Sequence, residues 1–425
     1  MMILFLGVLF LCFIAYVSLR CSVVSPSFIA SVSFLLFIAI GMMVKGDYDL
    51  NIFTTVIIFS SLLLFFLGTY LGERVKLKVR SNTQRNRKYK FSQKIKYVYV
   101  IIALICIYAL WSVSVDIALG IGNVYDFTTQ FLMNIRLASL KSSSFSEIYP
   151  MYLVAFMEIN RGVSYICIYF YMYNKYIYSS SDKFFLFPVV TYVVCIILRA
   201  SRGQLITLFI YCLILYTYFQ IYKYGIKYAK RKIIKSTILY SLSFFVLFFC
   251  MRYLRGGDFV IIENLFTYMG ASIFALDAMI DGDIHVNNGY GEYFGGHTLI
   301  GVYWLLNRVG VDVPKLNGGN LEFVYFKSGG DTNVYTFLGQ MISDYNILAI
   351  GVFIFTMGLF YGVFSNYVYS CSVPNFYICI YAYVMYPVFY MPIAEMFLMS
   401  FVSVFTLLDF FIMKILYDRY SELKE

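Results

Sequence analysis

Long apolar stretches alternate with short polar segments along the whole chain. A helix needs roughly 20 apolar residues to cross a bilayer, and several stretches approach or exceed that length. By this criterion the pattern predicts about eleven membrane-spanning helices. The predicted spans are 2–19, 27–44, 51–72, 97–119, 151–174, 184–198, 203–222, 236–251, 346–368, 376–393 and 397–415. We therefore expect an all-α polytopic membrane protein.

The composition excludes most classes of soluble protein. Of 425 residues, 61% are hydrophobic and only 13% are charged, and the mean hydropathy is +0.76. A soluble enzyme could not bury this much apolar surface, and disordered or collagen-like chains have different compositions. The nine cysteines show no spacing of a disulfide framework or a zinc site. The first stretch lacks a basic start and a clear cleavage site, so we interpret it as a retained helix.

The basic residues orient the predicted helices. The net charge of +10 comes from short basic runs between apolar stretches, which is typical of membrane topology and argues against a nucleic-acid partner. Residues 73–96 carry ten Lys or Arg residues and one acid, Glu73. The positive-inside rule places this segment in the cytoplasm, with the N-terminus outside and the C-terminus inside.

This topology divides the chain into three regions. Residues 1–251 hold the first eight predicted helices, 252–345 form one large outer segment, and 346–425 hold the last three helices and a cytoplasmic tail. The outer segment is rich in Gly, Asn and Asp and contains both histidines. Within it, 261–280 is apolar enough to lie on the membrane or dip into it, although Glu263 and Asp277 argue against a span.

The pattern R-x-x-R-G occurs at two outer helix ends, at 199–203 and 252–256. Two arginines three residues apart lie on one face of a helical turn, and each guanidinium can hold phosphate oxygens in a bidentate fork. The alternative is that these side chains reach lipid headgroups at the membrane surface. We expect pyrophosphate binding by Arg199, Arg202, Arg252 and Arg255.

A charged group also lies inside the fifth apolar stretch. Arg161 is accompanied there by Glu158 and Asn160. Ionisable residues inside a membrane are by default functional or paired. A structural ion pair between Glu158 and Arg161, one turn apart, is an equally good interpretation.

The outer segment offers candidates for proton transfer. Histidine exchanges protons near neutral pH, and His297 follows Gly295 and Gly296, where backbone can approach a ligand closely. A plain loop histidine is the alternative, and His285 is a weaker candidate. With two histidines and no cluster of metal ligands, we expect no metal centre.

Polar residues gather where the outer segment ends. Asp331, Thr332, Asn333 and Tyr335 follow two glycines and precede a predicted helix. They give dense hydrogen-bonding capacity for a hydroxyl-rich glycan. Helix capping by Asp331 or Thr332 is the alternative, and the two roles are compatible.

The sequence resembles the Wzy-type O-antigen polymerases, also called oligosaccharide repeat unit polymerases. The resemblance is carried by the segment GGDTNVYTFLGQMISDYNILAIGVFIFTMGLFYG at 329–362, by SRGQ at 201–204, and by the arginine-rich helix end at 252–256 before a large outer segment. It implies a GT-C-like fold and a metal-independent glycosyltransferase of the bacterial inner membrane without a cofactor. Its active site would face the periplasm.

The resemblance also implies a substrate and roles for residues. Such a polymerase moves a growing glycan from undecaprenyl pyrophosphate to the distal sugar of another lipid-linked repeat unit, in lipopolysaccharide or another polysaccharide. The partners are then this lipid-linked oligosaccharide, the bilayer and, as a further candidate, a chain-length regulator. The four outer arginines would match the family's essential ones. His297, or failing that Asp331, would accept the proton.

Two other functions fit the sequence. An O-antigen ligase uses the same donor with lipid A core as acceptor. A lipid-linked oligosaccharide flippase, which is not an enzyme, would also need arginines and many spans. A transporter should show internal repeats and charges deep in a central cavity, whereas the charges here concentrate at one predicted membrane face.

Overall fold

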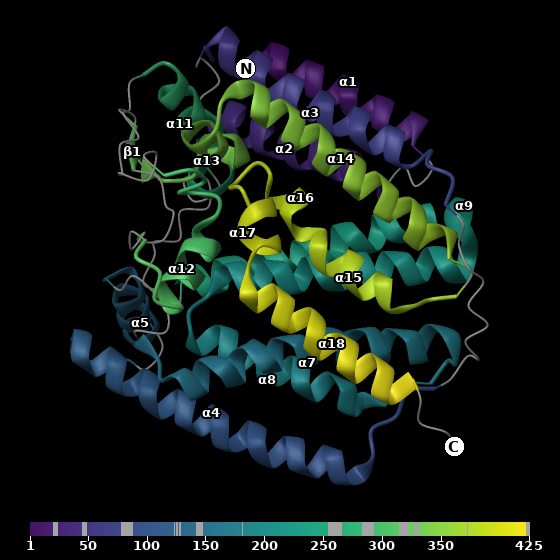
Figure 1. The fold of residues 1–425 in the computed structure, drawn as a ribbon, viewed down its shortest axis with the longest axis vertical. Helices are drawn as coiled ribbons and strands as arrows, with labels where there is room; N and C mark the ends of the chain where they lie inside the picture. Colours follow the sequence, from purple (N-terminus) through teal and green to yellow (C-terminus); the bar gives the residue numbers. More distant parts are fainter. Residues whose placement is uncertain are drawn as a thin grey trace. The chain divides into compact units, whose positions relative to one another are not determined.

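A computed structural model describes the chain except for short segments. The described residues are 1–19, 24–44, 49–77, 88–122, 124, 126, 129–141, 148–180, 182–253, 266–282, 293–313, 323–326, 331–371 and 373–421. They are mostly helical, and the elements follow one another as coloured in Figure 1. The elements up to α9 are α1 (Met2–Ser18), α2 (Pro26–Val44), α3 (Ile52–Gly72), α4 (Gln93–Ile121), α5 (Thr129–Lys141), α7 (Met151–Ile177), η2 (Lys183–Phe185), α8 (Leu186–Leu198) and α9 (Arg202–Tyr253). The later elements are η3 (Phe266–Gly270), α11 (Ala271–Ile280), α12 (Ile300–Arg308), β1 (Val324–Tyr325), β2 (Asp331–Thr332), α13 (Thr336–Asp344), α14 (Ile347–Ser370), α15 (Phe376–Val384), α16 (Tyr386–Tyr390), α17 (Phe397–Phe401) and α18 (Val404–Ser421).

The prediction of an all-α multi-pass membrane protein is confirmed at the level of helices. Six helices in the described part of the chain are long and apolar enough to cross a bilayer: α2, α3, α4, α7, the first part of α9 and α14. The remaining predicted spans fall on helices that are shorter, broken or less apolar, such as α1 and the pairs α15–α16 and α17–α18. The number of eleven crossings and the GT-C-like arrangement stay predictions.

Helix α9 covers two of the predicted spans. Gly225 has φ 75° and ψ 155°, which is not helical. The hydroxyl oxygens of Tyr216 and Ser236 are 2.9 Å apart, although 20 residues of continuous helix would separate them by about 30 Å. The chain therefore reverses at Gly225, where a positive φ is accessible to glycine without steric cost. The two halves of α9 are neighbours, as the predicted polar segment between 222 and 236 requires.

The chain forms two compact units that interleave in sequence. Unit 1 comprises residues 1–81, 260–372 and 384–403, and unit 2 comprises 82–259, 373–383 and 404–425. These units do not coincide with the three regions predicted from topology. Those regions were defined by the predicted membrane spans and by the side of the membrane on which the large segment lies.

In unit 1, α3 and α14 pack backbone against backbone. A Cβ atom at Gly68 would lie 2.3 Å from the carbonyl oxygen of Phe355, and one at Gly358 would come equally close to the backbone of α3. Gly72 and Gly362, four residues further along each helix, are just as tightly opposed. Membrane helices gain most of their association from such close packing, because lipid offers them no hydrophobic driving force.

The apolar part of the outer segment belongs to the interior of unit 1. In 266–280, η3 packs on α2, and all residues from Ala271 to Asp277 are buried. The carboxylate of Asp277 accepts a hydrogen bond of 3.1 Å from the backbone N–H of Asn51. This buried acid is compatible with a helix that packs against protein.

Unit 2 is built around α7, which packs against α8, α9 and α18. Its interior is aromatic: Tyr165 and Tyr211 are fully buried, with ring centroids 4.5 Å apart. The Tyr211 hydroxyl donates to the carbonyl oxygen of Tyr165 at 2.8 Å. Part of the high tyrosine content is therefore core, which interfacial belts alone do not explain.

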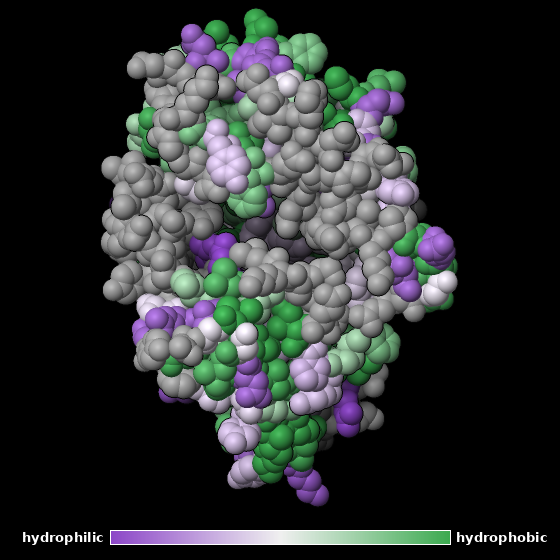
Figure 2. All heavy atoms as spheres, turned by 90° about the vertical axis from the view of Figure 1, so that its left-hand side faces the viewer, coloured by the Kyte–Doolittle hydropathy of each residue, from purple (hydrophilic) through white to green (hydrophobic). Residues whose placement is uncertain are grey.

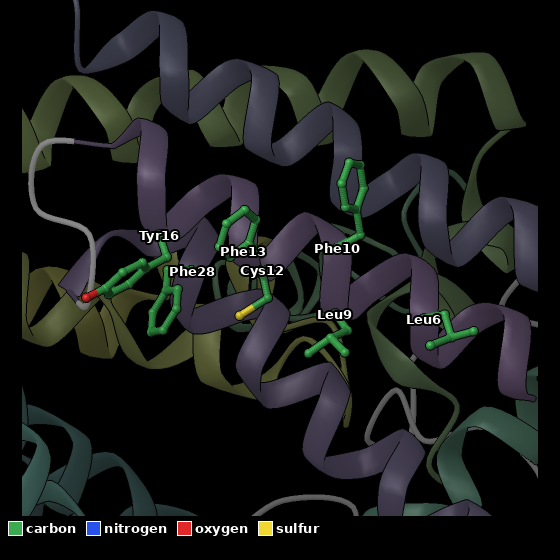
Figure 3. Close-up of a pocket in the computed structure, with 7 residues that line it drawn as sticks. All are labelled: Leu6, Leu9, Phe10, Cys12, Phe13, Tyr16 and Phe28. Carbon is green, nitrogen blue, oxygen red and sulfur yellow. The ribbon is translucent and has the colours of Figure 1, made fainter.

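Both units expose apolar side chains, as membrane helices do. Helix α4 exposes Ile101, Leu104, Ile105 and Tyr108. Figure 2 shows hydrophobic side chains between hydrophilic ones on one face of the structure. In unit 1, side chains of α1 together with Phe28 of α2 line an open apolar groove of about 540 Å³ (Figure 3). Its chemistry suits hydrocarbon chains of lipids.

Candidate functional site

Helix α7 carries charged residues in its interior turns. Arg161 lies ten residues after Met151, which is about 15 Å along the helix axis. Glu158 lies one turn closer to Met151, where α7 begins, and is only 5% exposed. A helix of 27 residues can carry these charges because most of its other positions are apolar and most of its surface is covered by neighbouring helices.

Ion pairs join α7 to two other elements of unit 2. Glu158 Oε2 lies 2.7 Å from Arg161 Nη1, which confirms the ion pair within α7. Arg161 Nε donates to Asp409 Oδ2 of α18 at 2.7 Å. Arg199 Nη1, at the end of α8, lies 3.6 Å from Glu158 Oε1. We call these four residues the charge cluster.

Helix α18 brings Asp409 into contact with α7 through a small residue. A Cβ atom at Gly162 would meet Ile412 at 3.2 Å and Asp409 Oδ1 at 3.4 Å, so glycine allows the close approach. Asp409 is fully buried, and its Oδ2 also accepts a hydrogen bond of 2.7 Å from the Tyr383 hydroxyl. The carbonyl oxygen of Phe405 accepts a hydrogen bond of 3.4 Å from Arg161 Nη2.

The junction between α8 and α9 sets the position of Arg199. Helix α8 ends at Leu198, and Ala200 follows with φ 50°. The N–H groups of Ala200 and Ser201 donate to the carbonyl oxygens of Ile197 and Ile196, which is a Schellman cap. A new helix begins at Arg202. The expectation that Arg199 and Arg202 share one helical turn is therefore wrong, because the left-handed residue between them ends the first helix.

The charge cluster is neutral as a whole and buried. Two carboxylates alternate with two guanidiniums, which offsets the large cost of placing charge away from water. It also has unused hydrogen-bonding capacity: among the described residues, Asp409 Oδ1 and the hydroxyls of Tyr165 and Tyr192 have no hydrogen-bond partner. Buried polar atoms usually have partners, so this arrangement is typical of a functional site more than of a purely structural ion pair.

His297 lies in a tight turn of unit 1. Its backbone N–H and that of Thr298 donate to the carboxylate of Asp344 at 3.1 and 2.8 Å, and the Thr298 hydroxyl donates to the same carboxylate. Gly295 has φ 70°, which begins this turn. The imidazole is fully buried. The structure thus shows what fixes the backbone of His297, while its role in proton transfer stays a prediction.

Glu395 is a buried carboxylate of unit 1 whose charge interacts with that of Asp344. Glu395, between α16 and α17, accepts hydrogen bonds from the backbone N–H groups of Leu398 and Met399 at 2.8 and 3.3 Å. Its own N–H donates to Gln340 at 2.7 Å. Burial raises the pKa of the Glu395 carboxyl to about 7, against the lowering effect of these backbone donors. It is therefore a further candidate for proton exchange near neutral pH.

The predicted glycan-binding residues lie on β2 and just after it. Thr332 is buried and accepts a hydrogen bond from the N–H of Val334, and Tyr335 is buried in a small apolar cluster with Ala275. Both observations support local structural roles, which are compatible with glycan binding but do not require it. Asn333 is partly exposed. Asp331 pairs with Tyr325 in the two-stranded sheet, and its side chain lies outside the described part of the chain.

The predicted arginines are described to different extents. Arg199 belongs to the charge cluster, and Arg202 begins α9. Arg252 lies near the end of α9, with its side chain outside the described atoms, and Arg255 lies outside the described residues. Arg199 belongs to unit 2 and His297 to unit 1. The prediction that they serve one active site stays a prediction.

Sequence reasoning missed Asp409, Tyr383 and Asp344. Asp409 is an acid within an apolar stretch, so its intramembrane position was a usable signal. Tyr383 is one of 42 tyrosines, and nothing in its surroundings in the sequence distinguishes it. Asp344 anchors a turn 47 residues earlier, a contact that depends on tertiary structure.

Comparisons with protein-family models, with curated proteins and with solved structures found no match.

Proposed function

We propose that this chain is a metal-independent, GT-C-like glycosyltransferase of the bacterial inner membrane, of the O-antigen polymerase type. It would transfer a growing glycan from undecaprenyl pyrophosphate to the distal sugar of another lipid-linked repeat unit on the periplasmic face. The observation that carries the proposal is the buried Arg199 at the break between α8 and α9, within an R-x-x-R-G pattern that recurs at 252–256.

The chemistry requires stabilisation of negative charge. The acceptor hydroxyl oxygen forms a bond to the anomeric carbon, the bond from that carbon to the diphosphate oxygen breaks, and the diphosphate leaves with the electron pair. Arginines in a largely buried position stabilise this developing charge strongly, and they need no metal to do so. The hydroxyl proton passes to a base, for which His297 is the first candidate and Asp331 the second.

A flippase for lipid-linked oligosaccharides is the second candidate. From the sequence we expected charges to concentrate at one membrane face, yet Glu158, Arg161 and Asp409 are paired within the helices of unit 2. Transporters use such intramembrane ionisable groups for substrate binding and proton coupling. This observation favours the flippase more than the sequence did.

Reconstitution with purified lipid-linked repeat units, without added metal, separates these functions. A polymerase gives a ladder of products, a ligase requires lipid A core, and a flippase leaves the units unchanged but moves them across the membrane. In cells, polymerase loss leaves one repeat per acceptor, ligase loss leaves none, and flippase loss keeps the unit inside.

The arginine assignment has a direct test in a strain that lacks its own polymerase for the same repeat unit. Arg199→Gln should reduce long polymer by at least about tenfold, because it removes a charge-assisted contact to the leaving group. Arg231→Gln, which changes an exposed arginine in the second part of α9, is the matched control and should leave polymer length unchanged. Normal ladders from Arg199→Gln would show that the assignment is wrong.

A further inference from the structure

Glu158 is shared unequally between two arginines. Its Oε2 lies 2.7 Å from Arg161, whereas its Oε1 lies 3.6 Å from Arg199. The longer separation is an ion pair beyond hydrogen-bond length, so Glu158 holds Arg199 less tightly than it holds Arg161. Arg161 is in turn fixed by its hydrogen bond to Asp409.

We infer that Glu158 is the internal counter-ion of Arg199, that an incoming diphosphate displaces it, and that Arg161, fixed by Asp409, keeps Glu158 paired after the exchange. This inference rests on the proposed function in one respect: it takes Arg199 as an anion-binding residue. Glu158 and Asp409 act through other side chains and are positioning residues.

The exchange avoids an unpaired charge in both states. Without a ligand, a buried Arg199 needs a counter-ion, because an isolated charge away from water is very costly. When phosphate oxygens take over the Arg199 guanidinium, the Glu158 carboxylate would become the unpaired group. Arg161 Nη1 is already 2.7 Å from it and prevents that cost.

Asp409 sets the orientation of Arg161 and the strength of its attraction for Glu158. It accepts from Arg161 Nε and orients the guanidinium, while the Phe405 carbonyl oxygen accepts from Nη2 and Nη1 is left facing Glu158. The negative charge of Asp409 also weakens the attraction between Arg161 and Glu158. Glu158 therefore keeps part of its attraction for Arg199, which tunes how readily an anion displaces it.

Calorimetric titration of the purified full-length chain in lipid nanodiscs with inorganic pyrophosphate tests the exchange. Glu158→Gln removes the competing charge and should tighten pyrophosphate binding by about tenfold. Arg199→Gln should weaken the binding by at least about tenfold. Glu73→Gln, which neutralises a buried carboxylate of unit 1, is the matched control and should change nothing. Thermal unfolding verifies that each variant is folded. If Glu158→Gln does not fold, Glu158→Asp takes its place. Its shorter side chain reaches Arg199 less well, so it should also tighten pyrophosphate binding.

The sign of the effect decides between exchange and a purely structural ion pair. If Glu158 only supported the Arg199 side chain, its removal would weaken the binding of pyrophosphate or leave it unchanged, and either result overturns the inference. Absence of pyrophosphate binding to both the unmodified chain and Glu158→Gln overturns it as well, as does an affinity that Arg199→Gln leaves unchanged.

A double-mutant cycle tests the role of Asp409. Asp409→Asn should tighten pyrophosphate binding by about threefold, because Arg161 then attracts Glu158 more strongly. In the Glu158→Gln background the same change should have no effect. An effect of equal size in both backgrounds would show that Asp409 does not act through Glu158.

These results are separable from the proposed function. If the reconstituted chain makes no glycan ladder but Glu158→Gln tightens pyrophosphate binding through Arg199, the polymerase proposal fails and the exchange stands. If ladders form and the binding data have the opposite sign, the exchange fails and the polymerase proposal stands.

Discussion

The helix contacts of the two units differ in the side chains that join them. In unit 1, α3 and α14 meet through glycines, with backbone against backbone. In unit 2, Gly162 also lets α7 and α18 approach closely, but charged side chains that alternate in sign join α7 to α18 and to the end of α8. A glycine contact depends on shape and has one good arrangement, whereas a chain of ion pairs can exchange partners at modest cost. Unit 2 is therefore the better candidate for a site that binds a charged ligand.

The largest expected effect concerns the charge cluster. Asp409→Leu removes one partner of a buried pair and should lower the free energy of unfolding by about 4 kcal/mol. Asp418→Asn, in the same helix, breaks a half-exposed ion pair with Lys414 and should cost no more than about 0.5 kcal/mol. Unfolding titrations in mixed micelles measure both. Equal costs would show that burial does not distinguish the two pairs.

The glycine contact should respond almost as strongly. Gly358→Ala places a Cβ atom 2.3 Å from the carbonyl oxygen of Phe65, so the helices must separate, at a cost of about 3 kcal/mol. Gly351→Ala is the control in the same helix, because its Cβ would meet only Leu64 Cδ1, at 3.5 Å. That variant should be neutral or slightly stabilised by helix propensity. The same titration measures both variants, and tolerance of Gly358→Ala would contradict the close approach.

The smallest effect is a pH dependence in unit 1. The Glu395 pKa is raised to about 7, so between pH 4.5 and 7 the folded carboxyl binds its proton more tightly than the unfolded one. The free energy of unfolding should therefore fall as pH rises through this window, by on the order of 2 kcal/mol, and level off above it. Glu395→Gln should remove this dependence in thermal unfolding between pH 5 and 8. An unchanged pH profile would exclude Glu395 as its source.

The positions of helices were largely predictable from the sequence. Each predicted span coincides with helix, because runs of apolar residues need no tertiary information to be recognised. Breaks within them were less accessible, such as those that divide 376–393 into α15 and α16 and 397–415 into α17 and α18, and so was the geometry of the link between 198 and 203. Ala200 takes a left-handed conformation with no glycine to signal it, since the cap is stabilised by hydrogen bonds back to α8.

The candidate site was predictable only in part. Arg199 and the pair of Glu158 and Arg161 stand out in the sequence because charge is scarce inside apolar stretches. Their connection to Asp409 was not visible, since 248 residues separate it from Arg161 and only helix packing joins them. For His297 the sequence indicated two glycines where backbone can approach a ligand closely, while the turn and its anchoring carboxylate, Asp344, came from the structure.

The sequence by itself determined that this is an all-α multi-pass membrane protein with its few charges at special positions. The reason is that a bilayer imposes length, hydropathy and charge rules on each segment independently of the others. Only the tertiary structure decided which charges neutralise one another and which glycines touch. Those outcomes depend on pairings between distant helices, which local sequence does not encode.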